Sequence, residues 1–206
     1  MPLQKEFYTR DSLIVAKELL GKILVHETHE GIISGKIVET EAYKGPEDKA
    51  AHSFGNKRTA RTETMYGPKG CTYIYLIYGL YYCINVTSGA LEGKPEASLI
   101  RAIEPLKGID LMMKRRGPTG KLTNVASGPG RLCIAMGLTK SHNGLDMSKP
   151  PLYITEGETV NEKDIIQSTR IGVDYAEEHK DLPWRFYIKN NTYVSVKPKN
   201  NKKDKA

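Results

Sequence analysis

Apolar residues along the chain fall into short runs that alternate with polar positions and are separated by glycine, proline and polar turns. Strict alternation predicts half-buried β-strands, and a repeat near 3.6 residues predicts helices. The expected strands are residues 23–28, 32–42, 97–105, 152–156 and 165–173, with a hairpin at 71–88 and a closing segment at 185–196 that turns at Asn190-Asn191. The expected helices are 12–20 after an Asp11 N-cap, 108–116 and 132–138. This mixture indicates an α+β chain in which the first two strands form an antiparallel pair.

The strand that contains residues 37–43 carries two acids. Successive side chains of a strand point to opposite faces, so Glu39, Glu41 and Tyr43 share one face. A Gly-Pro pair ends the strand, and the next residues form a short loop or helical turn that can fold His52 back toward the acids. Two carboxylates, a tyrosine and a histidine so close together fit an acid/base or metal centre. The alternative is the solvated face of an ordinary strand.

Residues 71–88 hold five of the twelve tyrosines and are expected to form a hairpin that turns near Tyr78. Tyr73 and Tyr75 share a face and are able to stack on a flat ligand, whereas Tyr78 would stand exposed at the apex. Asn85 is the polar residue of an otherwise apolar returning strand. The alternative is a tyrosine-rich core hairpin whose rings form cross-strand pairs.

Basic residues occur at two further places of interest. Arg101 is embedded in the apolar strand 97–105, so we expect it to pair with Glu39 or Glu41. Residues 53–70 are polar, basic and rich in glycine, and they predict an irregular loop. Such a loop either contacts phosphate or simply keeps the surface soluble.

Length and composition narrow the class of protein. A chain of 206 residues with 39% hydrophobic residues is expected to form one soluble globular domain, here residues 1–196. The three cysteines are widely spaced, and we find no secretory leader and no apolar run of the roughly 20 residues that span a bilayer. These features predict an intracellular protein, in the cytoplasm or on the nucleoid.

The net charge of +7 invites a polyanionic partner, but it is unevenly distributed. Residues 197–206 contain five lysines and one aspartate, a net of +4, which leaves +3 for residues 1–196. The C-terminal tail is therefore expected to be a disordered basic arm with weak attraction to phosphate. The charge of the remaining chain permits nucleic acid as a partner without requiring it.

Six short motifs lie in order along the chain. They are VETEAY at 38–43, GPED at 45–48 with AAH at 50–52, YLIYG at 75–79, LIRA at 99–102 with EP at 104–105, SGP at 127–129 and RFY at 185–187. Each motif is weak alone, but together they resemble the alkyladenine, or 3-methyladenine, DNA glycosylases of the non-helix-hairpin-helix type. The resemblance covers roughly residues 13–196. It implies a single mixed domain with a curved, mainly antiparallel sheet, flanking helices and a protruding β-hairpin.

The resemblance also implies an activity. Proteins of this type hydrolyse the N-glycosidic bond of damaged purines in double-stranded DNA, with no metal and no cofactor, and we expect no lyase step here. Glu41 matches the general base that activates water, and Arg101 matches an arginine at the water and phosphate. Tyr78 matches the side chain that is inserted into the duplex, while Glu39 is expected to play a supporting or structural part. One lesion needs one active site, so we expect a monomer.

The same resemblance implies the walls of a base pocket. Tyr43, His52 and Tyr75 match the residues that sandwich the extruded base. Asn85 matches the floor residue that disfavours guanine by crowding its exocyclic amine, and Leu99 matches a neighbouring wall. Aromatic faces grip any purine by stacking, and they attract a cationic alkylated purine further through cation–π interaction.

Two other functions stay open from the residues alone. Glu39, Glu41, Asp48 and His52 are acceptable ligands for Mg²⁺ or Mn²⁺, which would suit a metal-dependent nuclease. The tyrosine hairpin and the basic tail would also suit a non-catalytic nucleic-acid binding module. Sensitivity to EDTA distinguishes the nuclease from a glycosylase, and release of free base distinguishes a glycosylase from a pure binder.

Overall fold

The longest strand, β2 (Gly31–Tyr43), lies at the centre of the fold and carries both acids singled out above. Along one edge it pairs with β5 (Glu96–Lys107). Its other edge is shared, because the first half pairs with β1 (Ile23–Thr28) and the second half with β8 (Arg185–Ile188). The part of β2 that carries the acids is therefore hydrogen-bonded to a neighbouring strand on each side.

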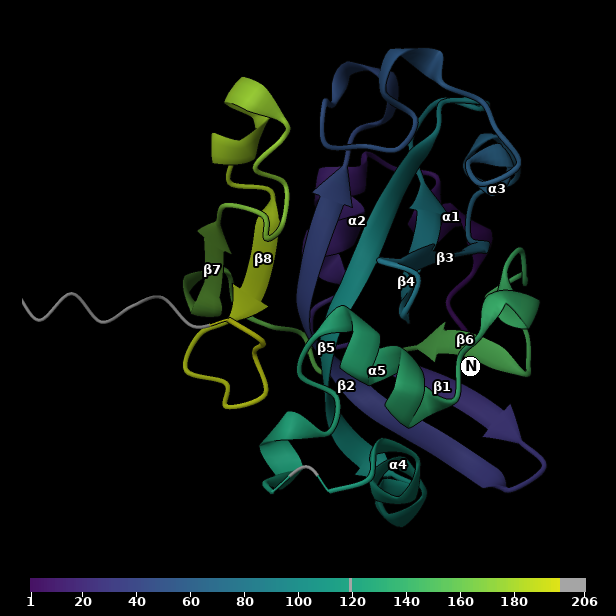
Figure 1. Ribbon diagram of the computed structural model, residues 1–206, viewed down its shortest axis with the longest axis vertical. Helices are drawn as coiled ribbons and strands as arrows, with labels where there is room; N and C mark the ends of the chain where they lie inside the picture. The colour runs from purple at the N-terminus through teal and green to yellow at the C-terminus, as the bar shows by residue number, and fades with distance from the viewer. Residues whose placement is uncertain (119, 197–206) are drawn as a thin grey trace, which may run out of the picture.

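The computed structural model describes residues 1–118 and 120–196. The remaining strands are β3 (Thr72–Ile77), β4 (Tyr81–Ser88), β6 (Leu152–Thr155) and β7 (Ile165–Ser168). The order across the sheet is β3-β4-β5-β2-β1-β6, with β8 beside β2 and β7 beside β8 (Figure 1). Each of these pairs is antiparallel. The strongly curled antiparallel sheet with its helices confirms the predicted α+β fold.

Local irregularities in β2 explain why the sheet curls. The pairing of β2 with β5 shifts register at Ser34/Gly35 and again on both sides of Glu39. An extra residue in one strand bends that strand and increases its right-handed twist. The sheet therefore bends at Glu39, beside the residues expected to form the site.

Short helices pack against the curled sheet. In the described residues they are α1 (Lys5–Tyr8), α2 (Ser12–Glu18), α3 (Glu63–Tyr66), α4 (Ile109–Arg116) and α5 (Pro129–Met136). The side chain of Asp11 accepts a hydrogen bond from the amide of Leu13, which confirms the predicted N-cap of α2. Helices α4 and α5 supply Met112, Leu132 and Met136 to the main core, where they meet the isoleucines of β2, β4 and β5. This core holds the sheet against which the site is built.

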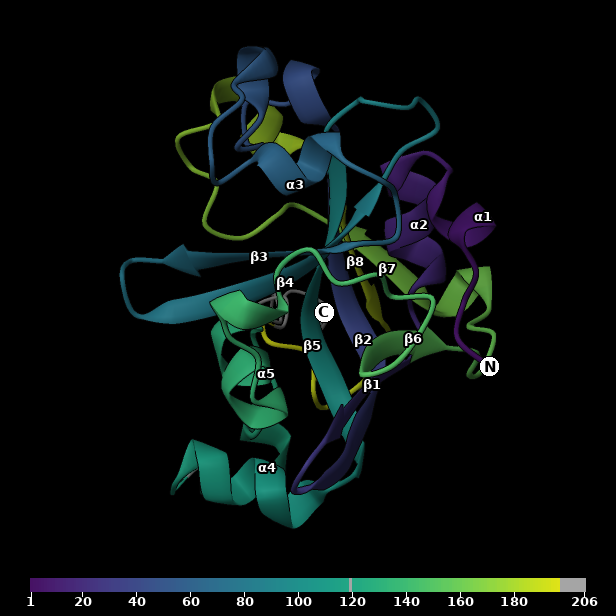
Figure 2. The same ribbon diagram turned by 90° about the vertical axis from the view of Figure 1, so that its right-hand side faces the viewer.

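The hairpin formed by β3 and β4 projects from the body of the molecule (Figure 2). Its register places Tyr73 opposite Asn85 and Tyr75 opposite Cys83. Tyr78 occupies the turn with a φ of 52° and is 82% exposed. A non-glycine residue in this left-handed region costs roughly 1 kcal/mol or more. The hairpin thus presents a strained aromatic residue at its tip.

Most of the predicted elements are confirmed, and the expected strands that prove wrong lie near the C-terminus. The strand expected over 165–173 is wrong after Ser168, and in 185–196 only β8 is a strand. The short helices α1 and α3 were not predicted, and α3 lies in the basic segment expected to be an irregular loop. The basic tail, 197–206, lies outside the described residues. Within the described part of the chain, the helices are all too short or too polar to cross a membrane.

Candidate active site

A cavity of about 700 Å³ opens beside the base of the hairpin. Its walls come from the loop after β2, the hairpin, β5 and the segment after β7, which are far apart in the sequence. Seven of the predicted site residues line it: Tyr43, His52, Tyr75, Tyr78, Asn85, Leu99 and Arg101. The eighth, Glu41, is fully buried and is not itself a lining residue. The fold therefore gathers around one cavity the positions that the motifs selected.

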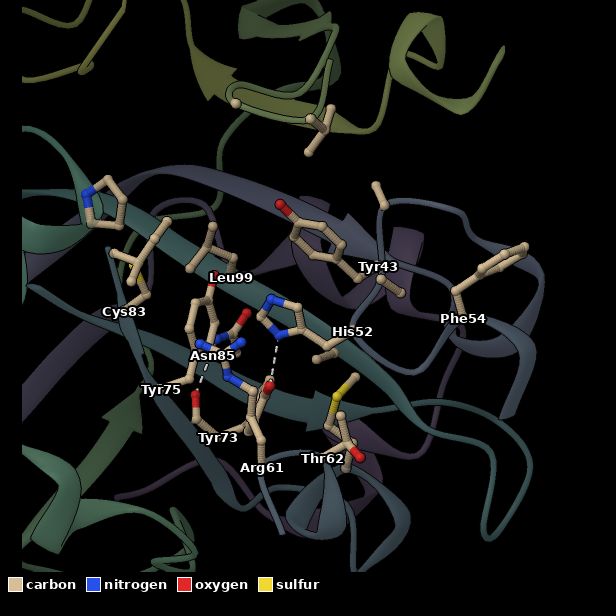
Figure 3. Close-up of a pocket in the computed structure, with 18 of the residues that line it drawn as sticks. Tyr43, His52, Phe54, Arg61, Thr62, Tyr73, Tyr75, Cys83, Asn85 and Leu99 are labelled. Atoms are coloured by element: carbon tan, nitrogen blue, oxygen red, sulfur yellow. Dashed lines mark hydrogen bonds between the residues drawn. The ribbon is translucent and has the colours of Figure 1, made fainter. Parts of the chain in front are cut away.

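Aromatic rings lie around the centre of this cavity (Figure 3). The rings of His52 and Tyr75 meet edge-on, with 4.5 Å between their centroids and 84° between their planes. Nδ1 of His52 lies 2.8 Å from the hydroxyl of Tyr73. Burial, helped by two nearby cations, lowers the pKa of His52 to about 4, so this ring is neutral at neutral pH. Together with Tyr43, these residues present uncharged aromatic surfaces to a flat ligand.

We call the part of the cavity lined by the rings of Tyr43, His52 and Tyr75 the aromatic slot. Glu41 lies directly behind this slot. Its Oε2 accepts a hydrogen bond of 2.8 Å from the hydroxyl of Tyr43, and its Oε1 accepts one of 2.8 Å from the backbone amide of Ile171. Nη1 of Arg101 lies 3.2 Å from the same Oε1. Burial and the charge of Glu41 raise the pKa of Tyr43 well above its usual value, which keeps its hydroxyl a donor. All three partners line the cavity, so one layer of side chains connects the carboxylate to the ligand space.

Glu39 has different surroundings, although it lies on the same strand. Its Oε1 receives Nε of Arg101 at 3.0 Å, Nη1 of Arg185 at 2.7 Å and the hydroxyl of Ser195 at 3.0 Å. Its Oε2 accepts the amide of Ser195 at 2.6 Å. The expected pairing of Arg101 with Glu39 or Glu41 is confirmed for both acids. Burial alone would lower the pKa of Arg101, but the charges of Glu41 and Glu39 outweigh it and raise that pKa.

The floor of the cavity comes from paired positions on β4 and β5. Asn85 is buried, lies opposite Leu99 and donates a hydrogen bond of 3.0 Å to the carbonyl of Tyr73. Cys83 also lines the cavity beside Tyr75, and burial raises the pKa of its thiol to about 11. Sequence reasoning did not select Cys83, although the hairpin register that places it opposite Tyr75 could have indicated it.

The rim of the cavity is partly exposed. Tyr78 lies there at the hairpin tip, two residues before Leu80, which is 72% exposed. The guanidinium of Arg61 lies over the ring of Tyr75, 5.2 Å from its centroid. Arg61 was part of the predicted basic segment, but nothing in the sequence placed it on an aromatic ring. The rim thus combines exposed apolar side chains with a cation.

The acids considered as metal ligands are occupied by arginines. Glu39 binds Arg101 and Arg185, while Asp48 binds Arg170 through two hydrogen bonds. In the described chain, no three histidine, cysteine, aspartate or glutamate side chains gather as ligands of one metal ion. The arrangement of these side chains therefore gives no support to the metal-dependent nuclease.

Comparisons with known proteins indicate the same family that the six sequence motifs resemble. The profile of a family described as methylpurine-DNA glycosylase (MPG) matches residues 6–192. A protein of Clostridium acetobutylicum named "Putative 3-methyladenine DNA glycosylase" is 52% identical over 204 residues, which cover 95% of this chain and 98% of that protein. Proteins with the same name from Desulfitobacterium hafniense and Clostridium novyi are 50% and 51% identical, each covering 95% of this chain and 98% of the relative.

Proposed function

The chain belongs to the methylpurine-DNA glycosylase family, and we propose that it excises alkylated or deaminated purines, 3-methyladenine among them, from double-stranded DNA. The proposed reaction is hydrolysis of the N-glycosidic bond by a water molecule that Glu41 activates. The observation that carries this proposal is the position of Glu41, a buried carboxylate held by three residues that all line an aromatic cavity.

The aromatic slot suits an extruded purine. A base inside a duplex cannot be reached by a buried acid, so it must leave the stack and enter a pocket. Stacking on Tyr43, His52 or Tyr75 would stabilise any purine by roughly 1–3 kcal/mol per base. A positively charged alkylated purine gains more from the same faces, and the neutral ring of His52 does not repel it.

The contacts of Glu41 leave it able to act as a base. An ionised carboxylate offers about four acceptor positions; Tyr43 and Ile171 donate hydrogen bonds to two of them, and Arg101 forms an ion pair with the same group. During the reaction the layer of side chains in front of Glu41 must admit a water molecule, and a free position of the carboxylate would accept its proton as that water bonds to the sugar carbon. The electron pair of the broken glycosidic bond goes to the departing purine. Positioned bases of this kind typically contribute about 10²–10⁴-fold to the rate.

The tip of the hairpin suits the hole that extrusion leaves in the duplex. Tyr78 is 82% exposed at the tip of a two-stranded protrusion, where it can be inserted between base pairs. Because all of the proposed site residues lie in one chain, a monomer is sufficient for the reaction. We propose that base removal is the sole chemical step and that it takes place on the DNA of the nucleoid.

Base-release chromatography tests this function. The protein is incubated with duplexes that each carry one modified purine, and we expect free purine and an abasic strand that stays intact until alkali is added. EDTA should leave the rate unchanged. Strand cleavage that EDTA abolishes would indicate the nuclease, strand cleavage coupled to base release would refute the single chemical step, and tight binding without any free purine would indicate a binding module.

A further inference from the structure

A buried ion pair between Asp48 and Arg170 lies behind the aromatic slot. Neither side chain has any exposed surface. Nη1 and Nη2 of Arg170 lie 2.5 and 2.9 Å from the two oxygens of Asp48, in the two-pronged geometry that arginine forms with carboxylates. The same two nitrogens donate to the carbonyls of Ala42 and His179. The catalytic contacts of Glu41 use neither residue, so the pair needs another explanation.

The guanidinium of Arg170 is also stacked between two rings. It lies 4.9 Å from the centroid of the Tyr43 ring and 4.9 Å from that of the Trp184 ring. Tyr43 lines the cavity and Arg170 does not. The cation therefore lies against Tyr43 outside the lining of the cavity, and we place a stacked base on the other face of this ring.

Asp48 supplies the only carboxylate within bonding distance of this guanidinium among the described residues. Its oxygens also accept the backbone amides of Lys44 and Ala50, which fixes it in the loop that leads to His52. His179 is 3.5 Å away, but its Nδ1 accepts the amide of Lys49, so that nitrogen carries no proton to share with Asp48. The two charges thus balance each other immediately behind the slot.

We propose, on the basis of the function given above, that the Asp48–Arg170 pair sets the preference of the slot between cationic and neutral purines. A base stacked on Tyr43 would lie about 8 Å from the guanidinium, which is the 4.9 Å to the ring plus an ordinary stacking contact of roughly 3.5 Å. At that distance an unbalanced charge in a protein interior still changes binding measurably. Asp48 cancels the charge of Arg170, so Tyr43 can hold the stacking guanidinium on one side and a cationic purine on the other.

An unbalanced charge on Arg170 would affect neutral purines in the opposite way to cationic purines. A cationic base departs as a neutral molecule, whereas a neutral base develops negative charge as its bond to the sugar breaks. An unbalanced cation behind Tyr43 would therefore weaken capture of a cationic purine and assist departure of a neutral purine. The ratio of kcat/KM for a cationic lesion to that for a neutral lesion reports this charge directly, because a loss of folded enzyme lowers both values equally.

The test compares base release from duplexes containing 7-methylguanine, a cation, and hypoxanthine, which is neutral. Asp48→Asn keeps the shape of the side chain but leaves Arg170 unbalanced, and we expect the cationic-to-neutral ratio to fall about fivefold or more. Arg170→Gln removes the cation instead and leaves the anion of Asp48 unbalanced, so the ratio should rise above that of the unaltered protein. A purely structural pair would lower both activities in parallel in both variants, which would overturn the proposal.

A double variant, Asp48→Asn with Arg170→Gln, is the matched control because it restores neutrality without restoring the ion pair. Its ratio should return to within about twofold of the original, even if both rates are lower. Unpaired buried charges destabilise proteins, so the single variants are assayed with a stabilising osmolyte. If Asp48→Asn still fails to fold, Arg170→Gln decides, because the unbalanced anion of Asp48 should raise the ratio and an unaltered ratio contradicts the proposal.

Failure of this inference differs from failure of the proposed function. If the unaltered protein releases neither 7-methylguanine nor hypoxanthine, the glycosylase assignment itself is wrong. If it releases both and the ratio does not respond to Asp48→Asn, only the role of the Asp48–Arg170 pair is wrong.

Discussion

Two buried acids on one strand differ in what surrounds them. Glu39 is held by two arginines and by Ser195, so its oxygens are directed into the interior of the protein. Glu41 is held by residues that line the cavity and shares only Arg101 with Glu39. Carboxylates in such different environments are suited to different tasks, here a structural counter-charge and a proposed base.

Glu39→Gln should mainly reduce stability. The change removes the negative charge that balances Arg101 and Arg185 in the interior, and breaking a buried ion pair in this way typically costs about 3–5 kcal/mol. Denaturant unfolding should therefore show a loss of about 3 kcal/mol in the free energy of unfolding. The folded fraction should retain base-release activity, and a fully stable but inactive variant would reverse the roles given to the two acids.

His52 should make the protein less stable in mild acid. Its pKa is lowered from 6.5 to about 4, so below 6.5 the unfolded chain takes up a proton that the folded protein resists. Above pH 6.5 this group does not affect the free energy of unfolding. As the pH decreases toward 4, the free energy of unfolding falls by up to about 3 kcal/mol in total. Unfolding free energies measured across that range test this.

His52→Phe is the matched variant, since it keeps a ring in the slot but cannot be protonated. Between pH 6.5 and 4, the free energy of unfolding of this variant should fall by up to about 3 kcal/mol less than that of the unaltered protein. Identical pH profiles for the two proteins would mean that His52 already takes up protons in the folded state.

At the scale of elements, the hairpin tip carries a specific prediction. Tyr78→Ala should weaken binding to a duplex with an abasic site more than binding to undamaged duplex, because only the former offers a hole to fill. Tyr78→Gly should bind as Tyr78→Ala does but be more stable, because glycine adopts the positive φ of this turn without strain. Fluorescence anisotropy with both duplexes measures the difference.

Leu91 provides the control for the hairpin. It is 64% exposed, but it lies in the loop before β5 and away from the cavity. Leu91→Ala should leave both affinities unchanged. Equal losses on damaged and undamaged DNA for Tyr78→Ala would argue against insertion of this side chain.

Local patterns in the sequence predicted most helices and strands correctly, but they failed for the segment after β7. Apolar residues from Ile165 to Val173 read as one strand, yet pairing ends at Ser168. The chain leaves the sheet there because Arg170 is bound by Asp48, more than a hundred residues earlier, and Ile171 by Glu41. Such long-range contacts override local propensity and cannot be read from periodicity.

For the whole molecule, charge is the feature that the sequence describes best. Deleting residues 197–206 removes a net charge of +4 from a total of +7. The affinity for DNA should then depend less steeply on salt concentration, while the preference among lesions should stay the same. Binding titrations at several salt concentrations, together with lesion-specific rates, check this. A changed lesion preference would mean that the tail reaches the site.

Residues of the candidate site could be predicted chiefly at positions that belong to the six sequence motifs. The motifs selected positions that the fold brings around one cavity, although Tyr43, Tyr75 and Leu99 lie on three different strands. The partners of those residues were not predictable, because no local pattern places Arg170 on the ring of Tyr43 or Arg61 on the ring of Tyr75. Sequence thus indicated residues that line the cavity, and the structure reveals the layer of side chains that supports them.

Glu41→Gln provides the most direct test of the central claim. The variant keeps the size of the side chain but cannot take a proton from water, so single-turnover base release should fall at least about a hundredfold. Its affinity for a duplex with an alkylated purine should change little, because the slot and the hairpin remain. Activity above about a tenth of that of the unaltered protein would contradict Glu41 as the base.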